Sequence, residues 1–304
     1  MEYILETHAL CKQFGQHKAV SNVSMHIQKG AIYGFVGKNG AGKTTLIRLL
    51  CGLQLPTSGD FTLYGRRSTE RNFARTRRKI GAVVESCSIY LDMSAQENLK
   101  QQYHILGLPS YDGLQELLQL VKLDTTGKKK CRDFSLGMRQ RLGIAIALAG
   151  DPDFLILDEP VNGLDPQGII EIRELILKLN REYGITVLIS SHILDELAKL
   201  ATHYGFIDNG CLIKEIEAGE LKAVCRKCVN IEVNNTRTLS HVLDAMGLEY
   251  TVLSDTRAAI YEEVRVSQLA LALHPYSCEI ITITEHNENL ESYFVNLVGG
   301  EHCV

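Results

Sequence analysis

The sequence predicts an α/β protein built as two domains. A glycine-rich stretch at residues 37–45 lies between a strand pattern and a helix pattern, and strands and helices alternate again from about residue 150. After Gly219 the elements become weaker. Because alternating strands and helices are typical of a mainly parallel sheet covered by helices, we expect one domain over residues 1–218 and a small α/β domain over residues 219–304.

Composition indicates a reduced globular chain. Of 304 residues, 45% are hydrophobic and 22% charged, and the net charge of -4 is too small to indicate a nucleic-acid partner. The nine cysteines have no framework spacing, and the N-terminus lacks the basic start and apolar core of a signal peptide. Apolar stretches fall short of the roughly 20 residues that cross a bilayer. We expect a cytoplasmic protein that contacts a membrane only through a partner.

The elements follow in order along the chain. The first thirty residues predict short strands with a polar turn at residues 11–18. A buried strand at 31–37 precedes a helix at 44–53, and a later run of small and β-branched residues ends at the carboxylate of Glu85. Helical patterns dominate residues 90–150.

The glycine-rich stretch GKNGAGKTT fits the phosphate-loop pattern G-x-x-x-x-G-K-S/T. Backbone N–H groups converge on an anion only where no side chain blocks them, and the following helix adds its positive end. Lys43 supplies a cation for phosphates, and the Thr44 hydroxyl suits Mg²⁺. The alternative is a purely structural glycine loop. The expected nucleotide contacts in this stretch are Gly37, Lys38, Asn39, Gly40, Ala41, Gly42, Lys43, Thr44 and Thr45.

A second buried strand, FLILDEP at 154–160, ends in two acids. We expect Asp158 to hold Mg²⁺ through the water shell of the ion and Glu159 to orient and polarise the attacking water. A helix-capping pair is the alternative interpretation. His192 follows another apolar strand, so we expect it at the same sheet edge, where it can contact the γ-phosphate; alone, such a histidine is more often a surface residue.

The stretch FSLGMRQRL at 134–142 resembles the signature of the ATP-binding subunits of ABC transporters. The resemblance covers about residues 3–216 and includes the phosphate loop, DFLILDEP, NGLDP and His192, in the family's order. It departs from the common signature at Leu136 and Met138, while Ser135 and Gly137 match. It implies that these two residues bind the nucleotide of a second cassette, in a homodimer or with a related partner.

The resemblance also implies the architecture of a P-loop NTPase ABC cassette. That architecture has a mixed, mainly parallel sheet core, an antiparallel β subdomain and a helical subdomain at about 90–150, here followed by the small C-terminal α/β domain. Phe14 matches the aromatic residue that stacks on adenine; a buried loop aromatic is the alternative. Glu85 stands where the family has a glutamine that reaches Mg²⁺. This exchange resembles bacitracin and lantibiotic exporters.

The resemblance implies the ATP-hydrolysing subunit of an exporter, with ATP and Mg²⁺ as cofactors and a separate membrane permease as partner. The resemblance implies a peptide antibiotic or related amphiphile as cargo and a place on the inner face of the membrane. Two other functions stay open: a non-transport ATPase acting on DNA or ribosomes, and a nucleotide-binding regulatory module. The basic run at 66–79 lacks regularly interleaved aromatics, so we expect no nucleic-acid contact.

Overall fold

The computed structural model describes residues 2–299 except 226–227, 263 and 287–289. Its contacts divide the chain into two units. The first runs to Ala218 and is joined by Val298 and Gly299, and the second is Gly219–Leu297. We describe each unit by itself.

The first unit begins with an antiparallel sheet in the order β2-β1-β5-β6, with β3 also paired to β1. The expected turn at residues 11–18 is wrong, because β1 continues to Phe14 and only Gly15 and Gln16 turn the chain. One face of an antiparallel sheet can be exposed, and these strands contain both buried and exposed residues. Its strands are β1 (Tyr3–Phe14), β2 (His17–Val23), β3 (His26–Gln28), β5 (Ser58–Leu63) and β6 (Arg66–Arg67).

A six-stranded sheet forms the centre of this unit, in the order β11-β10-β4-β9-β8-β7. All its pairings are parallel except that of β11 with β10. Every residue of β4, β8 and β9 is buried, which explains their nearly continuous apolar sequences. The strands are β4 (Ile32–Val36), β7 (Ile80–Val83), β8 (Phe154–Asp158), β9 (Thr186–Ser191), β10 (His203–Asp208) and β11 (Cys211–Glu217).

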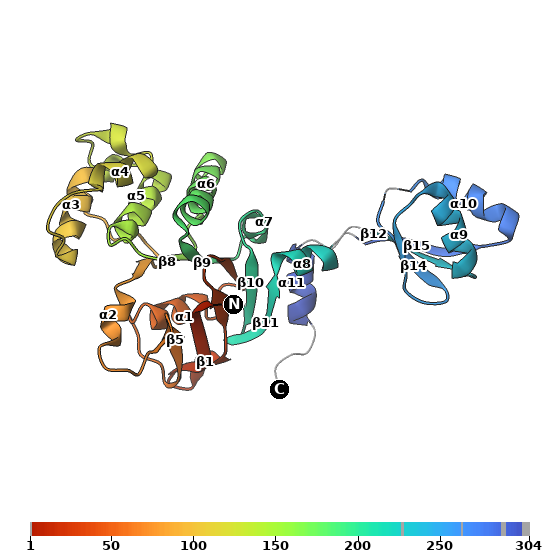
Figure 1. The fold of residues 1–304 in the computed structure, drawn as a ribbon, viewed down its shortest axis with the longest axis horizontal. Coiled ribbons are helices and arrows are strands. Elements are labelled where there is room, and N and C mark those ends of the chain that lie inside the picture. The colour runs from red at the N-terminus through yellow and green to blue at the C-terminus, as the bar shows by residue number, and fades with distance from the viewer. Residues whose placement is uncertain (1, 226–227, 263, 287–289, 300–304) are drawn as a thin grey trace. The chain divides into compact units, whose positions relative to one another are not determined.

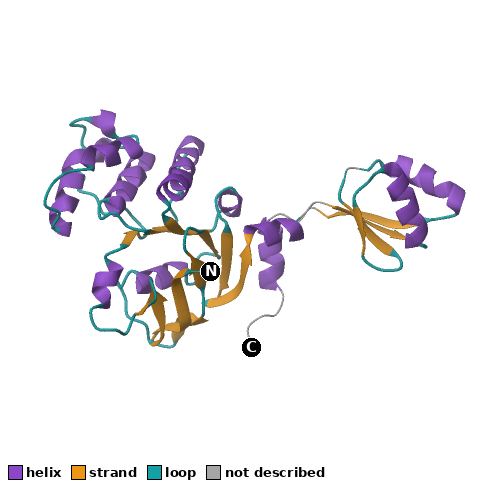
Figure 2. Ribbon diagram, viewed as in Figure 1, coloured by secondary structure: helices purple, strands orange, loops and turns teal. Residues whose placement is uncertain are grey.

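Helices of the first unit lie around this sheet and in a separate helical group. The group α3, α4 and α5 forms a helix-only layer in Figure 2, as the expected helical subdomain requires. Ser94 and Glu97 form a reciprocal capping box that starts α3. The helices are α1 (Lys43–Leu50), α2 (Phe73–Arg77), α3 (Ala95–Leu106), α4 (Leu114–Leu120), α5 (Leu136–Leu148), α6 (Pro166–Tyr183) and α7 (Leu194–Ala198), with short 3₁₀ turns at Asp124–Thr126 and Cys131–Asp133.

The basic run at 66–79 is part of this packed fold. It contains β6 and α2, and Phe73 and Thr76 are buried. The guanidinium of Arg77 lies 5.1 Å from the centroid of the Phe73 ring. Part of this positive charge therefore packs on the protein's own aromatic surface.

The second unit contains an antiparallel sheet in the order β13-β14-β12-β15 (Figure 1). Leu239 and Leu243 of α9 and Leu269 and Leu273 of α10 pack with the strands in one apolar core. The elements are α8 (Ala218–Val224), β12 (Cys228–Val233), α9 (Thr236–Met246), β13 (Tyr250–Val252), β14 (Arg257–Ile260), α10 (Val266–Leu273), a 3₁₀ turn at His274–Tyr276, β15 (Ile280–His286) and α11 (Leu290–Gly299).

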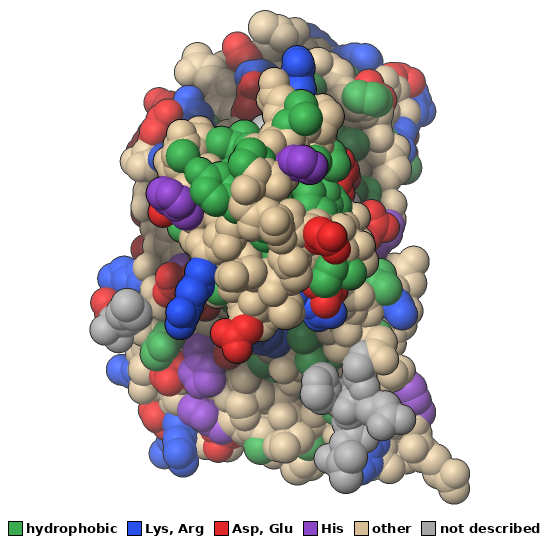
Figure 3. Space-filling model, turned by 90° about the vertical axis from the view of Figure 1, so that its right-hand side faces the viewer, with side chains coloured by type: hydrophobic (Ala, Val, Ile, Leu, Met, Phe, Trp, Pro, Cys, Tyr) green, Lys and Arg blue, Asp and Glu red, His purple; other side chains and the backbone are tan. Residues whose placement is uncertain are grey.

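This small unit also presents apolar side chains on its outside. Figure 3 shows small groups of hydrophobic side chains among polar and charged ones on the face that it draws. Val266, Leu271 and Tyr276 are among the exposed hydrophobic residues of the unit. Throughout the described part of the chain, no helix combines the length and apolarity that crossing a bilayer requires.

Candidate functional site

The phosphate loop lies at the carboxyl end of the central sheet, between β4 and α1. Gly42 adopts a φ of +106°, which side-chain-bearing residues rarely do, and a Cβ there would collide with the backbone oxygen of Ala19. A Cβ at Gly37 would likewise meet the backbone oxygen of Ile207. The glycines therefore allow the loop to curl tightly ahead of the helix.

Lys43 is folded over this loop. Its side chain is 6% exposed, and Nζ donates to the backbone oxygens of Gly37 at 2.6 Å and Lys38 at 3.2 Å. Nζ also lies 3.3 Å from Oε1 of Glu159. The loop thus holds a buried cation. Its counterion, Glu159, follows β8, which is separated from β4 in the sheet by β9.

The two acids after β8 are fixed by Ser190 of β9. The Ser190 hydroxyl donates to Oδ1 of Asp158 at 2.6 Å and accepts from the backbone N–H of Glu159 at 3.0 Å. Asp158 is 1% exposed, and its Oδ2 has no hydrogen-bond partner among the described residues. A buried carboxylate oxygen without a partner is costly unless a cation or donor meets it.

Glu159 connects Lys43 to His192. Its Oε2 lies 2.8 Å from Nδ1 of His192, while Oε1 faces Lys43. Glu159 has a φ of +50°, an unusual conformation for a residue with a side chain and one that clusters at functional sites. The structure thus brings Lys43 to a residue 116 positions later in the sequence, and His192 to the same residue from 33 positions beyond it.

A cavity of about 390 Å³ opens over the loop. Most of the predicted nucleotide contacts line it, whereas Gly37 and Ala41 do not, because they are buried beneath it. The predicted residues in its lining are Phe14, Lys38, Asn39, Gly40, Gly42, Lys43, Thr44, Thr45 and Glu159. Asp158, His192, Glu85, Ser135 and Gly137 are outside that lining.

Sequence reasoning did not single out three further lining residues, His17, Ala19 and Asn162. His17 pairs directly with Phe14 across the β1–β2 turn, so a correct hairpin register would have identified it. Asn162 lies in the quoted NGLDP stretch. Ser190 was also missed, although a polar residue at the end of an apolar strand was a usable signal.

Phe14 is an exposed platform at the edge of the cavity. Its side chain is 47% exposed, and Nζ of Lys12 lies 5.1 Å from the ring centroid while donating to the Leu55 carbonyl at 2.7 Å. The alternative of a buried loop aromatic is therefore wrong. An exposed ring beside a phosphate loop can stack on a planar base.

The signature stretch starts α5 and is accessible. Ser135 is the N-cap, and its hydroxyl accepts from the Met138 N–H at 3.2 Å. Ser135 and Leu136 are exposed, while Phe134 is buried and anchors the turn. A capping serine with its O–H directed outward can donate to an anion that approaches the helix start.

Glu85 is paired with a basic side chain of the helix that follows the phosphate loop. It has a φ of +61°, and its Oε1 accepts from Nη2 of Arg48 at 2.6 Å. Arg48 belongs to α1, the helix that follows the phosphate loop. The expectation that Glu85 reaches Mg²⁺ remains a prediction, and this ion pair is a contact that the sequence did not reveal.

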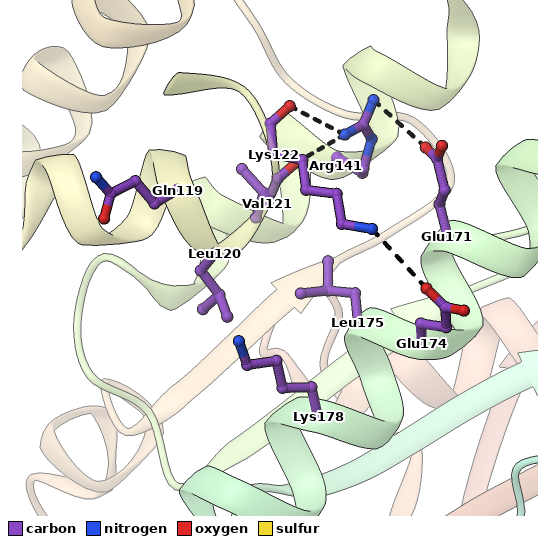
Figure 4. Close-up of a pocket in the computed structure, with 9 residues that line it drawn as sticks. All are labelled: Gln119, Leu120, Val121, Lys122, Arg141, Glu171, Glu174, Leu175 and Lys178. Carbon is purple, nitrogen blue, oxygen red and sulfur yellow. Dashed lines mark hydrogen bonds and ion pairs between the residues drawn. The ribbon is translucent and has the colours of Figure 1, made fainter. Parts of the chain in front are cut away.

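A second cavity, of about 260 Å³, lies between the helical group and α6 (Figure 4). Arg141 of α5 dominates one wall: its Nη1 donates to the backbone oxygens of Val121 at 2.9 Å and Lys122 at 3.1 Å. Its Nη2 lies 3.5 Å from Glu171 of α6, and Lys122 lies 3.8 Å from Glu174. One guanidinium thus ties the signature helix to the residues that follow α4 and to α6.

Comparison with known proteins gives a consistent result. The family model for the ABC transporter matches residues 20–162. The bacitracin transport ATP-binding protein BcrA of Bacillus licheniformis is 39% identical over 99% of this chain and 99% of its own length. An uncharacterized ABC transporter ATP-binding protein, YcbN of Bacillus subtilis (strain 168), is 39% identical over 99% of this chain and 98% of its own length. The lantibiotic transport ATP-binding protein SrtF of Streptococcus pyogenes is 44% identical over 70% of this chain and 91% of its own length.

Solved structures share the fold of the first unit. The cbiO1 protein of Clostridium perfringens, part of the ABC transporter complex cbiONQ, has a TM-score of 0.66 at 25% identity, covering 73% of this chain and 92% of that one. A dimeric ATP-binding cassette bound to ADP and Pi has a TM-score of 0.63 at 24% identity, covering 70% of this chain and 98% of that one. The expected fold class is confirmed.

Proposed function

Because the chain belongs to the family of ABC transporter ATP-binding proteins, which bind nucleotide and hydrolyse ATP, we propose that it powers a separate permease exporting a peptide antibiotic or related amphiphile. The contact chain from Lys43 through Glu159 to His192 is the observation that carries the hydrolytic part. The cargo rests on the relatives, two of which are named for bacitracin and lantibiotic transport.

Nucleotide binding begins with the loop. Backbone N–H groups of residues 37–45 and the start of α1 offer donors to the phosphates, and Lys43 adds a positive charge. Phe14 lies at the rim of the same cavity, where adenine can stack on its ring. His17, its hairpin partner, also lines this cavity and is a further candidate to contact the base or the ribose.

Magnesium suits the oxygen atoms of this site. Mg²⁺ prefers hard oxygen ligands and takes few of them from the protein. The buried Oδ2 of Asp158, which lacks a partner among the described residues, and the Thr44 hydroxyl supply such ligands. Glu85 is a third candidate once it leaves Arg48. When bound, the metal would neutralise charge on the β- and γ-phosphates.

Glu159 is the proposed general base. Lys43 contacts one of its oxygens and His192 the other, so the carboxylate is oriented before nucleotide arrives. Phosphates that bind Lys43 loosen the contact with Oε1, which can then accept a proton from water beside the γ-phosphate. With the Nδ1–H of His192 donating to the carboxylate, Nε2 donates to the γ-phosphate when the ring is the imidazolium, which carries a proton on both nitrogens.

A second cassette completes the site in this proposal. Ser135 and Gly137 are outside the lining of the chain's own nucleotide cavity, and Ser135 is exposed at a helix start. We infer a head-to-tail dimer, most simply of two copies of this chain, in which each signature meets the other copy's nucleotide. The chain would sit on the inner face of the membrane through its permease, without nucleic acid. Residues 219–304 would form an accessory domain.

Copurification tests the transporter assignment. Expressed with its genomic neighbours, the tagged chain should copurify with a multispanning membrane protein and raise tolerance to bacitracin-like peptides. The Glu159→Gln variant should copurify without raising tolerance, because assembly needs no hydrolysis. Association with ribosomes or DNA in place of a membrane protein would favour the non-transport alternative.

A further inference from the structure

We propose that Arg48 is a positioning residue of the nucleotide site, which holds Glu85 away from the phosphates until Mg²⁺ competes for the carboxylate. The inference rests on the proposed ATPase function, because it concerns the same nucleotide and metal. It assigns a purpose to an ion pair that the catalytic scheme leaves unused.

The position of Arg48 on its helix is the first support. Arg48 follows Thr44 by four residues on α1, so the two side chains share one face of the helix and lie one turn apart. Thr44 lines the nucleotide cavity, and Arg48 does not. The helix therefore carries a positively charged side chain one turn after the hydroxyl expected to ligate the metal.

The position of Glu85 is the second support. Val83 at the end of β7 pairs with Leu157 of β8, and the next residue of β8 is Asp158. Glu85 thus leaves the sheet at the edge where Asp158 does. Its left-handed backbone, with φ at +61°, accompanies a carboxylate bonded to Arg48 at 2.6 Å instead of one lining the cavity.

Charge explains why such a pair is useful. A carboxylate beside a triphosphate is repelled by it unless a cation lies between them. Glutamine at position 85 would carry no charge and need no counterion, whereas Glu85 does. Arg48 supplies this counterion within the protein. Incoming ATP therefore meets a neutral ion pair and not an isolated carboxylate.

The pair is weak enough to open. The side chains of Arg48 and Glu85 are 35% and 55% exposed. An ion pair this exposed shifts an equilibrium by only about two- to fivefold. A divalent cation held by Thr44, Asp158 and the phosphates can therefore draw Glu85 away from Arg48. The strength of the ion pair then sets the Mg²⁺ concentration that is needed.

The test compares the Mg²⁺ requirement for nucleotide binding in four proteins: the parent, Arg48→Met, Glu85→Gln and the double variant. The probe is methylanthraniloyl-ATP, titrated by fluorescence against Mg²⁺ and separately in EDTA. Arg48→Met should lower the half-saturating Mg²⁺ concentration about two- to fivefold because Glu85 is released. It should also weaken metal-free binding by leaving Glu85 unpaired.

The Glu85→Gln background shows whether Arg48 acts through Glu85. There, Arg48→Met should leave the Mg²⁺ requirement close to that of Glu85→Gln itself. Arg48→Lys should keep the parent's value, since it retains the cation. Lys29→Met, which removes an exposed cation paired with Glu2, is the matched control.

Equal effects of Arg48→Met in both backgrounds would overturn the proposal, because the two residues would then act independently. Failure of the ATPase function would look different. The parent would not bind the probe, or Lys43→Ala would bind it as well as the parent, and both proposals would fall together.

Discussion

Oε1 of Glu159 lies 3.3 Å from Nζ of Lys43, so the expected base neutralises the expected phosphate ligand. Both side chains are largely shielded, at 19% and 6% exposure. Nucleotide phosphates and Glu159 therefore compete for one cation. The carboxylate becomes available to water when phosphate takes its place, which links the readiness of the base to occupancy of the site.

Replacing Glu159 with glutamine should separate binding from hydrolysis. The neutral amide no longer competes for Lys43, so ATP should bind about three- to tenfold tighter. Loss of the base should slow hydrolysis about 10²- to 10⁴-fold. The variant should accumulate as a dimer with ATP, seen by light scattering after gel filtration; a monomeric, fully active variant would remove Glu159 from its role.

Lys43→Ala should weaken ATP binding about 10- to 100-fold, since it removes a charged donor and leaves Glu159 facing the phosphates. The Lys43→Ala, Glu159→Gln double variant should recover part of that loss because the repelling carboxylate is gone. Calorimetric titration with ATP measures both. Lys199→Ala, which removes an exposed cation paired with Glu196, is the control and should bind like the parent. No recovery in the double variant would mean that the ion pair does not govern binding.

Arg141→Ala should destabilise the first unit. It leaves the carbonyls of Val121 and Lys122 without this donor and Glu171 without this partner. The expected loss is about 2 kcal/mol, or a melting temperature about 4–8 °C lower by scanning calorimetry. Arg132→Ala removes an exposed pair with Asp92 and should cost under about 0.5 kcal/mol. Equal losses of unfolding free energy in the two variants would show that the contacts of Arg141 do not stabilise the first unit.

The capping box of α3 should give this helix an acid dependence. Hydrogen bonds from the Ser94 N–H and from Lys130 lower the pKa of Glu97 from 4.5 to about 2. A depressed carboxylate pKa stabilises the fold fully above pH 4.5, and this contribution disappears as the pH falls toward 2. Carbon-detected NMR should place the Glu97 midpoint near 2, and Glu97→Gln should remove this group's share of the acid dependence. A Glu97 midpoint at 4.5 would contradict the structure.

Local patterns were sufficient for much of the fold. The buried strands β4, β8 and β9 were predictable because full burial on both faces produces unbroken apolar runs. The course of β1 through residues 11–14 was not, because a half-exposed strand and a turn have similar polar composition. The place of His17 in the cavity lining was not predicted for the same reason, since it depends on the register of that hairpin.

The sequence by itself determined which residues stand at the ends of the strands and which loop can curl around phosphate, because glycine spacing and apolar runs are local properties of the chain. Only the tertiary structure decided the partners: Lys43 with Glu159, Ser190 with both acids, and Arg48 with Glu85. These contacts join residues between 31 and 116 positions apart. The proximity of these residues in space follows from the order of strands in the central sheet, which no local pattern encodes.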